Sequence, residues 1–403
     1  MIPFAPPRID QEMIDEVVDT LRSGWITTGP KTRLFEQQLA TYCEVEDVLA
    51  VNSATAGLEL MLRWFGVGPG DEVIVPAYTY CATANVVIHC GAKPVMVDVG
   101  PDFNINVEGI AKALSAKTKV ILPVDLGGWP CDYDEILQIA RNAPFKPANE
   151  IQEQLGRILV LTDGAHSLGA RYKERISGSL ADATVFSFHA VKNLTTAEGG
   201  AIALNLPSPF DNGAIYTSLR TKSLHGQSND ALAKFQKSSW EYDVFEAGYK
   251  MNLTDIQAAL GIAGFKVYES ETLPRRRAIF EEYNKALAEF PWATIPPLAS
   301  NSKKSACHLY LLKLKNIDLE TRNLIIQKIL AKKVAVNVHY KPLPILSFYK
   351  KLGYDIADFP VANEHWCTEI TLPVFYGLSN SNIEEVVSTL SSSVHSDKNE
   401  TIV

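Results

Sequence analysis

Short apolar runs alternate with amphipathic stretches along the first half of the chain. The runs are rich in β-branched residues and too short for buried helices, which predicts strands buried on both faces. They occupy residues 48–51, 72–76, 94–99, 120–124, 158–163, 183–188 and 199–204. The stretches between the first five are long enough to hold helices. This alternation predicts an α/β fold with a mostly parallel central sheet covered on both faces.

The C-terminal third shows a different pattern. A helical pattern runs from residue 254 towards 287, and proline-rich residues 291–297 break it. The remainder predicts strands at 306–314, 334–344 and 370–375 and a helix at 319–333, with a frayed polar tail from 391. We therefore expect a large domain over 1–265, with the N-terminal segment, and a small C-terminal α+β domain over 266–403.

Two other segments stand out in the large domain. Helical spacing and a capping residue, Asp10, predict a helix over 10–22 that ends at Gly24. Residues 127–157 are longer than a usual crossover, and only their first part reads as a helix. The sequence predicts no function for this insertion.

Composition excludes several classes of function. The net charge is −8, and no basic cluster offsets it, which argues against nucleic-acid binding. The N-terminus lacks a secretory pattern, and no apolar run is long enough to span a membrane. The six cysteines lack CxxC spacing and are expected to be reduced thiols, neither disulfides nor zinc ligands. We expect a cytoplasmic protein without a metal site.

The segment 183–204 concentrates the candidate chemistry. It predicts a strand, a polar turn and a second strand, with Lys192 in the turn. A lysine between apolar strands can lose hydration, which lowers its pKa and makes the amine a nucleophile suited to Schiff-base formation. From the turn alone, a solvated lysine in a polar hairpin is an equally good interpretation.

Polar residues also follow other predicted strands. Ala54 and Thr55 open a helix, where free backbone N–H groups can bind phosphate, although a simple helix cap is the commoner explanation. Tyr78 and Tyr80 follow the second strand, where an aromatic side chain can stack on a flat ring, although a tyrosine near a strand end more often belongs to the core or its rim. Asp163 ends the fifth strand, where a buried carboxylate requires a cation such as a protonated pyridine nitrogen. Residues at these strand ends meet at one edge of a parallel sheet.

The segment SFHAVKNLTTAEGG, residues 187–200, resembles the lysine loop of the DegT/StrS-type nucleotide-sugar aminotransferases, which are pyridoxal phosphate (PLP) enzymes of fold type I. Matching stretches in the same order extend from about residue 3 to about residue 375. The resemblance implies that PLP is the cofactor and that Lys192 forms its Schiff base. Some relatives carry histidine there and dehydrate sugars, so the retained lysine points to transamination.

The resemblance also implies roles for individual residues. Catalytic roles fall to Lys192, Asp163 and His189. The implied cofactor contacts are Ala54, Thr55, Tyr80, Asp163, His166, Ser187, Lys192, Asn193 and Lys250. The implied substrate contacts are Thr28, His339 and Tyr340.

Two family motifs are altered in this chain. In GYKMNLTDIQAALG, residues 248–261, Lys250 and Asn252 stand where the commonest family form has Asn and Arg. This element is expected to reach the neighbouring subunit of a homodimer, where Lys250 would contact the cofactor phosphate. In the HYxPLH motif that begins at His339, Pro344 replaces the last histidine.

The activity that the resemblance implies is transfer of an amino group from glutamate to a nucleotide-linked keto sugar. The favoured acceptor is a UDP-4-keto-6-deoxy-HexNAc aminated at C4, a step in polysaccharide or amino-sugar biosynthesis. The alternatives are a PLP-dependent sugar dehydratase and a catalytically inactive regulatory relative.

Overall fold

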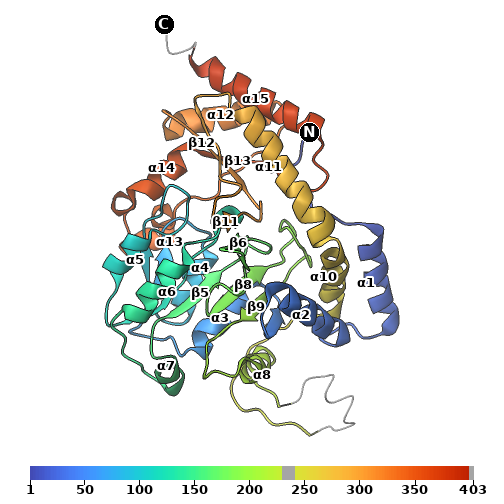
Figure 1. Cartoon of the computed structure of the whole chain (residues 1–403), viewed down its shortest axis with the longest axis vertical. Coiled ribbons are helices and arrows are strands. Elements are labelled where there is room, and N and C mark those ends of the chain that lie inside the picture. Colours follow the sequence, from blue (N-terminus) through green and yellow to red (C-terminus); the bar gives the residue numbers. More distant parts are fainter. Residues whose placement is uncertain (229–240, 399–403) are drawn as a thin grey trace.

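A seven-stranded mixed sheet forms the centre of the molecule. The computed structural model describes residues 1–228 and 241–398 (Figure 1). The strands are β1 (Asp47–Val51), β2 (Glu72–Pro76), β3 (Lys93–Val97), β4 (Thr118–Ile121), β5 (Leu159–Asp163), β8 (Ala183–Ser187) and β9 (Gly200–Leu204). Their order is β1-β9-β8-β5-β4-β2-β3, and β9 alone among these seven runs antiparallel to its neighbours. The predicted α/β fold with a mostly parallel sheet is confirmed.

Helices cover both faces of this sheet. In β1, Leu49 and Val51 join the core beneath one face, and Val48 and Ala50 join the core of the other. The helices of this part are α1 (Gln11–Ser23), α2 (Pro30–Cys43), α3 (Ala54–Trp64), α4 (Ala82–His89), α5 (Val107–Ala113), α6 (Tyr133–Asn142), α7 (Glu150–Leu155), α8 (Asn212–Ser223) and α10 (Asp255–Lys266). α6 and α7 both lie in the 127–157 insertion. The alternation of inward-facing side chains on both faces explains why the strands read as continuous apolar runs.

Local signals set several helix boundaries. Asp10 accepts a hydrogen bond from Met13 N at 3.1 Å, and Gly24 ends α1 with φ 74°, as predicted. The single long helix expected over 254–287 is wrong. A π-helical turn at Tyr268–Thr272 separates α10 from α11 (Leu273–Leu287), which carries the chain towards the C-terminal part (Figure 1).

The C-terminal part contains a small antiparallel sheet of β10 (Ala293–Thr294), β12 (Tyr310–Leu314) and β13 (Glu369–Leu372). Its helices are α12 (Leu319–Ala331), α13 (Ser347–Lys351), α14 (Pro360–Thr368) and α15 (Asn380–Lys398). A three-stranded sheet of β6 (Arg171–Tyr172), β7 (Arg175–Ile176) and β11 (Lys303–Lys304) joins this part to the rest. The expected domain boundary at 265/266 stays a prediction.

Two sequence predictions for this part are wrong. Residues 334–344 form no strand, and their strand-type backbone pairing with other described residues is limited to the isolated bridges Ile2 to Val334 and Asn337 to Thr371. The tail is not frayed up to residue 398, because α15 continues there and buries Ser393 and Val394.

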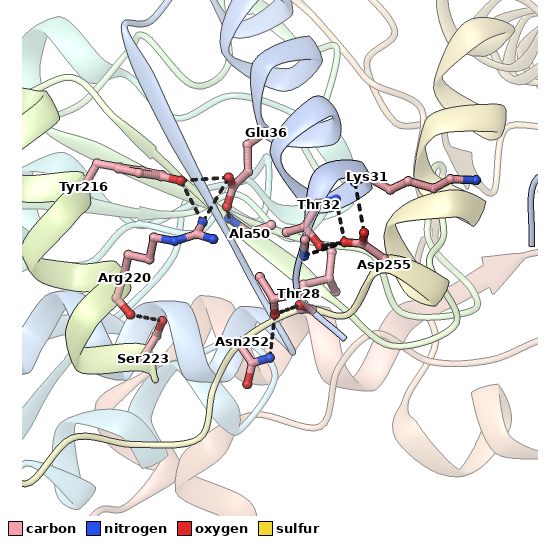
Figure 2. Close-up of polar contacts among 12 residues, drawn as sticks. Thr28, Lys31, Thr32, Glu36, Ala50, Tyr216, Arg220, Ser223, Asn252 and Asp255 are labelled. Atoms are coloured by element: carbon pink, nitrogen blue, oxygen red, sulfur yellow. Dashed lines mark hydrogen bonds and ion pairs between the residues drawn. The ribbon is translucent and has the colours of Figure 1, made fainter. Parts of the chain in front are cut away.

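Buried carboxylates tie α2 to its surroundings (Figure 2). Asp255 of α10 accepts hydrogen bonds from the backbone N–H groups of Gly29, Lys31 and Thr32 at 2.8–3.1 Å, and from the Thr32 hydroxyl at 2.7 Å. These bonds satisfy the free N–H groups at the start of α2.

Glu36, within α2, joins three elements in a similar way. Its carboxylate accepts hydrogen bonds from Ala50 N at 2.9 Å and from the Tyr216 hydroxyl at 2.8 Å, beside Arg220 (Figure 2). These hydrogen bonds hold α2, β1 and α8 together.

Two further observations concern the cysteines and the apolar character of the helices. All six cysteines lie in the described residues and are unpaired, and four of them are buried. Within residues 1–228 and 241–398, no helix combines the length and apolar character that crossing a membrane requires.

Candidate active site

A cavity of about 500 Å³ opens at the carboxyl ends of the parallel strands. Its volume lies in the range usual for small-molecule sites. The residues predicted for the site that line it are Ala54, Thr55, Tyr80, Asp163, His166, Ser187, His189, Lys192, His339 and Tyr340. They come from positions up to 286 residues apart (54 to 340), so the sheet edge and the C-terminal part together bring them to one place.

Lys192 lies in the turn between β8 and β9, and its half-buried side chain forms part of the cavity wall. Burial lowers the pKa of its amine from 10.5 to about 8, although the charge of Asp163 acts in the opposite direction. A substantial fraction of the amine is therefore neutral near physiological pH. This is the protonation state that a nucleophilic amine requires.

Asp163, at the end of β5, is the buried carboxylate of the cavity, with 6% of its surface exposed. Oδ2 accepts a hydrogen bond from the Thr83 hydroxyl at 2.8 Å, and Oδ1 accepts one from Ala165 N at 3.2 Å. Burial raises its pKa, against the effect of both bonds and of Lys192. Within the described part of the chain, no basic side chain lies within ion-pair distance of this carboxylate. The site thus offers a buried carboxylate that a cation from outside the chain would hold in its ionised form.

The first turn of α3 forms an anion-binding corner. Ser53 caps the helix by accepting a hydrogen bond from Ala56 N at 3.1 Å, which leaves the N–H groups of Ala54 and Thr55 directed out of the helix start. Gly200 passes directly behind this turn, and a Cβ there would come within 2.6 Å of Ala54 N. The Ser187 side chain lines the same cavity. Free N–H groups, a hydroxyl and the positive end of a helix dipole suit a phosphate.

His166 and Tyr340 form a linked pair in the wall of the cavity. Gly127 N donates a hydrogen bond to His166 Nδ1 at 3.2 Å, so Nδ1 carries no proton. Burial lowers the pKa of His166 well below 6.5, and the neutral ring therefore has its proton on Nε2. Nε2 donates to the Tyr340 hydroxyl at 3.2 Å. The hydroxyl proton of Tyr340 then remains available to a bound molecule.

Tyr80 and His189 lie at the rim of the cavity. Tyr80 is 59% exposed and lines the cavity, and its ring centroid lies 5.9 Å from that of Tyr340, so the residue is accessible to a planar ligand. His189 is exposed, with Nε2 at 3.6 Å from Glu198 Oε1. Its position next to Lys192 places it at the mouth of the cavity and away from its buried floor.

Asn193 does not line the cavity. Its Nδ2 donates to Ala306 O at 2.7 Å, and its Oδ1 accepts a hydrogen bond from His308 Nδ1 at 2.8 Å. Asn193 thereby ties the lysine turn to the segment that precedes β12. The structure places it behind the site, where the sequence suggested a cofactor contact.

Thr28 and Lys250 also lie outside the cavity of their own chain. Thr28 is buried, donates a hydrogen bond to Leu253 O and accepts one from Asn252 Nδ2 at 2.6 Å (Figure 2). Lys250 is exposed, and its backbone pairs with Leu224. Neither residue lines the cavity of its own chain, and their contacts with substrate and cofactor stay predictions.

The sequence interpretation missed two buried side chains that hold the site residues. Thr83 bonds Asp163, and Glu369 of β13 accepts a hydrogen bond from His339 N at 3.0 Å. Thr83 begins a helix, where threonine is an ordinary residue, and Glu369 lies in a short apolar strand. A glutamate in such a strand is the one signal that could have marked it as functional.

These residues fit the cofactor that the resemblance implies. The carboxylate of Asp163 suits a protonated pyridine nitrogen, the start of α3 suits a phosphate, and the Lys192 amine suits an aldehyde. All three groups line one cavity.

Comparison with known proteins agrees with this fit. The model of the DegT/DnrJ/EryC1/StrS aminotransferase family matches residues 7–391. The chain is 36% identical to the spore coat polysaccharide biosynthesis protein SpsC of Bacillus subtilis over 391 residues, which covers 96% of this chain and 95% of SpsC.

Solved structures show the same likeness. The PMP form of Spr1654 from Streptococcus pneumoniae, described as a sugar aminotransferase, is 45% identical with a TM-score of 0.95, covering 98% of this chain and 100% of that one. PseC of Helicobacter pylori, an aminotransferase involved in the biosynthesis of pseudoaminic acid, is 26% identical with a TM-score of 0.86, covering 98% of this chain and 99% of PseC.

Proposed function

Because the chain belongs to the DegT/DnrJ/EryC1/StrS aminotransferase family, we propose that it moves an amino group from glutamate to the ketone of a nucleotide-linked sugar. Its cofactor is pyridoxal 5′-phosphate, which when bound supplies an electron sink for the electron pair left on a carbon that loses its proton. The proposed acceptor is a UDP-4-keto-6-deoxy-HexNAc that is aminated at C4. The roles of SpsC in polysaccharide biosynthesis and of PseC in pseudoaminic acid biosynthesis support an acceptor of this class.

One observation carries the proposal: the cavity is lined by a lysine amine of lowered pKa and by a buried carboxylate that has no basic side chain within ion-pair distance in the part of the chain that the structure describes. Lys192 is the group that would take the proton from the α-carbon of glutamate and, in the second half of the reaction, give a proton to the sugar carbon that receives the amino group. Its pKa of about 8 lets it exchange protons near neutral pH. Asp163 keeps a proton on the ring nitrogen of the cofactor by its charge. Thr83 keeps Asp163 oriented and favours its ionised form.

The remaining residues of the cavity bind and orient. The N–H groups of Ala54 and Thr55 and the hydroxyl of Ser187 hold the phosphate, and Tyr80 stacks on the cofactor ring. Tyr340 donates its hydroxyl proton to the sugar, because its oxygen is already occupied by His166 Nε2–H. His189 covers the mouth of the cavity beside Lys192.

The proposal includes a homodimer with shared active sites. Lys250 and Thr28 lie outside the cavity of their own chain, and Val244 and Phe245, which precede Lys250, are 52% and 68% exposed. Large apolar side chains at that exposure suit an interface with a second copy. In the dimer, Lys250 supplies positive charge to the cofactor phosphate in the neighbouring subunit.

The test is a screen of nucleotide-linked 4-keto and 3-keto sugars with glutamate and the PLP-loaded enzyme. We expect one 2-oxoglutarate for each amino sugar formed, with the UDP-4-keto-6-deoxy-HexNAc as the best acceptor. A dehydratase would consume the sugar without forming 2-oxoglutarate, and a regulatory relative would convert none of the sugars. Either result would refute the proposal.

A further inference from the structure

A buried hydrogen-bond chain leads from β13 to the cavity wall. The carboxyl group of Glu369 is fully buried, and its Oε1 lies 2.5 Å from the Thr371 hydroxyl oxygen. The same hydroxyl lies 2.8 Å from His339 Nδ1. The Oε2 atom of Glu369 also accepts a hydrogen bond from the backbone N–H of His339 at 3.0 Å. The glutamate thus fixes both the backbone and the ring of a histidine that lines the cavity.

The number of protons in this chain permits two arrangements. Burial, together with the charge of Lys192, lowers the pKa of His339 to about 3, so its ring carries one proton at neutral pH. If Glu369 is ionised, Thr371 donates to Glu369 and His339 Nδ1 donates to Thr371, which leaves Nε2 without a proton. If Glu369 is protonated, it donates to Thr371, Thr371 donates to Nδ1, and the ring proton lies on Nε2. Every hydrogen bond of the chain is kept in both arrangements.

We propose that Glu369 is a positioning residue that, through Thr371, decides whether His339 Nε2 donates or accepts a hydrogen bond towards the sugar in the cavity. This inference rests on the proposed function, because it assigns the sugar to the cavity that His339 lines. Nε2 has no hydrogen-bond partner among the described residues, whereas Nδ1 is held against β13. The free nitrogen is therefore the one that can meet a ligand.

The change from protonated to ionised Glu369 moves protons along the hydrogen-bond chain. Hydroxide from the solvent in the cavity removes the proton from Nε2 and becomes water. The Thr371 hydroxyl proton then passes to Nδ1, and the Glu369 proton passes to the Thr371 oxygen. One proton leaves through the cavity, and Glu369 becomes a carboxylate.

The surroundings of Glu369 favour its protonated form at neutral pH. Burial raises the pKa of Glu369 to about 8, although the bonds from Thr371 and His339 and the charge of Arg322 act to lower it. The other titratable groups near the chain are Tyr78 and Tyr340, which face Glu369, and Lys192, His166 and His308, which face His339. Below about pH 8, His339 Nε2 is then a donor, which suits a ketone oxygen. Above it, Nε2 becomes an acceptor.

The test follows the histidine itself. The PLP-loaded enzyme is labelled with ¹⁵N-histidine, and its nitrogen NMR signals report which ring nitrogen carries the proton. The signals of His339 are identified as those that disappear in His339→Gln. We expect the proton to move from Nε2 to Nδ1 as the pH rises through about 8. Glu369→Gln should remove this pH response and hold the proton on Nε2. The Gln carbonyl must accept the hydrogen bond from His339 N, so its NH2 group faces Thr371 and donates to it. Thr371→Val should also remove the response, and Thr371→Ser, which keeps the hydroxyl, should preserve it.

Two results would overturn the inference: a His339 tautomer that does not change between pH 6 and 10 in the unmodified enzyme, or an unchanged response in both Glu369→Gln and Thr371→Val. If one variant fails to fold, the other still decides. The signal does not depend on turnover, so an enzyme that aminates no keto sugar would refute the proposed function and leave this measurement interpretable. If this movement of protons acts on substrate, KM for the keto sugar should rise above pH 8 in the unmodified enzyme and stay constant in Glu369→Gln.

Discussion

Thr83→Val removes the hydrogen bond from Thr83 to Asp163 and keeps the Asp163 carboxylate itself. The Thr83 hydroxyl donates to Asp163 Oδ2 at 2.8 Å and therefore has no second proton for Thr79, whose hydroxyl lies 3.0 Å away and must donate to it. Valine has nearly the same shape and removes only these bonds. The carboxylate would then keep one protein hydrogen bond, from Ala165 N.

The structure gives a magnitude for this loss. A hydrogen bond to a charged group contributes about 1.5–3 kcal/mol. If that contribution keeps Asp163 ionised opposite the cofactor ring, the rate constant of the reaction with glutamate should fall about 10- to 150-fold. Because the Thr83 bond lowers the pKa of Asp163, its loss should also raise that pKa further.

The assay is a single-turnover measurement, in which the absorbance of bound PLP disappears after glutamate is added. Thr83→Ser keeps the hydroxyl and should stay near the unmodified rate. Thr79→Val keeps the Thr83 to Asp163 bond and should lose less than Thr83→Val. A Thr83→Val enzyme with unchanged Tm and a rate within twofold of the unmodified enzyme would refute the reasoning.

Three further predictions follow from the same geometry. Asp163→Asn removes one partner of a buried charge pair, which costs about 3–5 kcal/mol, so turnover should fall at least about 100-fold with a milder loss of bound PLP; unchanged turnover would contradict this. In the cofactor-free enzyme, only neutral Lys192 reacts with PLP, so the association rate should rise with pH and level off above about 8; a rise that continues to pH 10 would show an unperturbed amine. Asp255→Ala leaves the buried donors of Gly29 and Thr32 without their acceptor, so the free energy of unfolding in urea should fall by at least about 2 kcal/mol. Lys31→Ala keeps the Asp255 carboxylate and the backbone donors and should have a milder effect.

The central sheet and its polar edge could be predicted from the sequence because both depend on local patterns. Each of the seven strands is a short apolar run. Asp163 ends one of these runs, and Lys192 lies in the turn between two others. The π-helical turn at Tyr268–Thr272 was missed, although Pro274 in the first turn of α11 is a local signal that a helix begins there.

The contacts that hold the site join residues far apart in the chain. The bond from Thr83 to Asp163 spans 80 residues, and the bond from Tyr340 to His166 spans 174. No spacing rule connects such pairs. The segment 334–344 read as a strand because of its alternating valines, but its prolines at 342 and 344 cannot donate backbone hydrogen bonds, and the chain there makes only isolated bridges.

The most direct test of the account is to locate the lysine that bonds PLP. Reduction of the PLP-loaded enzyme with borohydride fixes the cofactor on its lysine, and peptide mass spectrometry identifies the residue. The account predicts one modified lysine per chain, Lys192, and no modification in Lys192→Ala. A cofactor attached to another lysine, or none attached in an enzyme that still transfers amino groups, would contradict it.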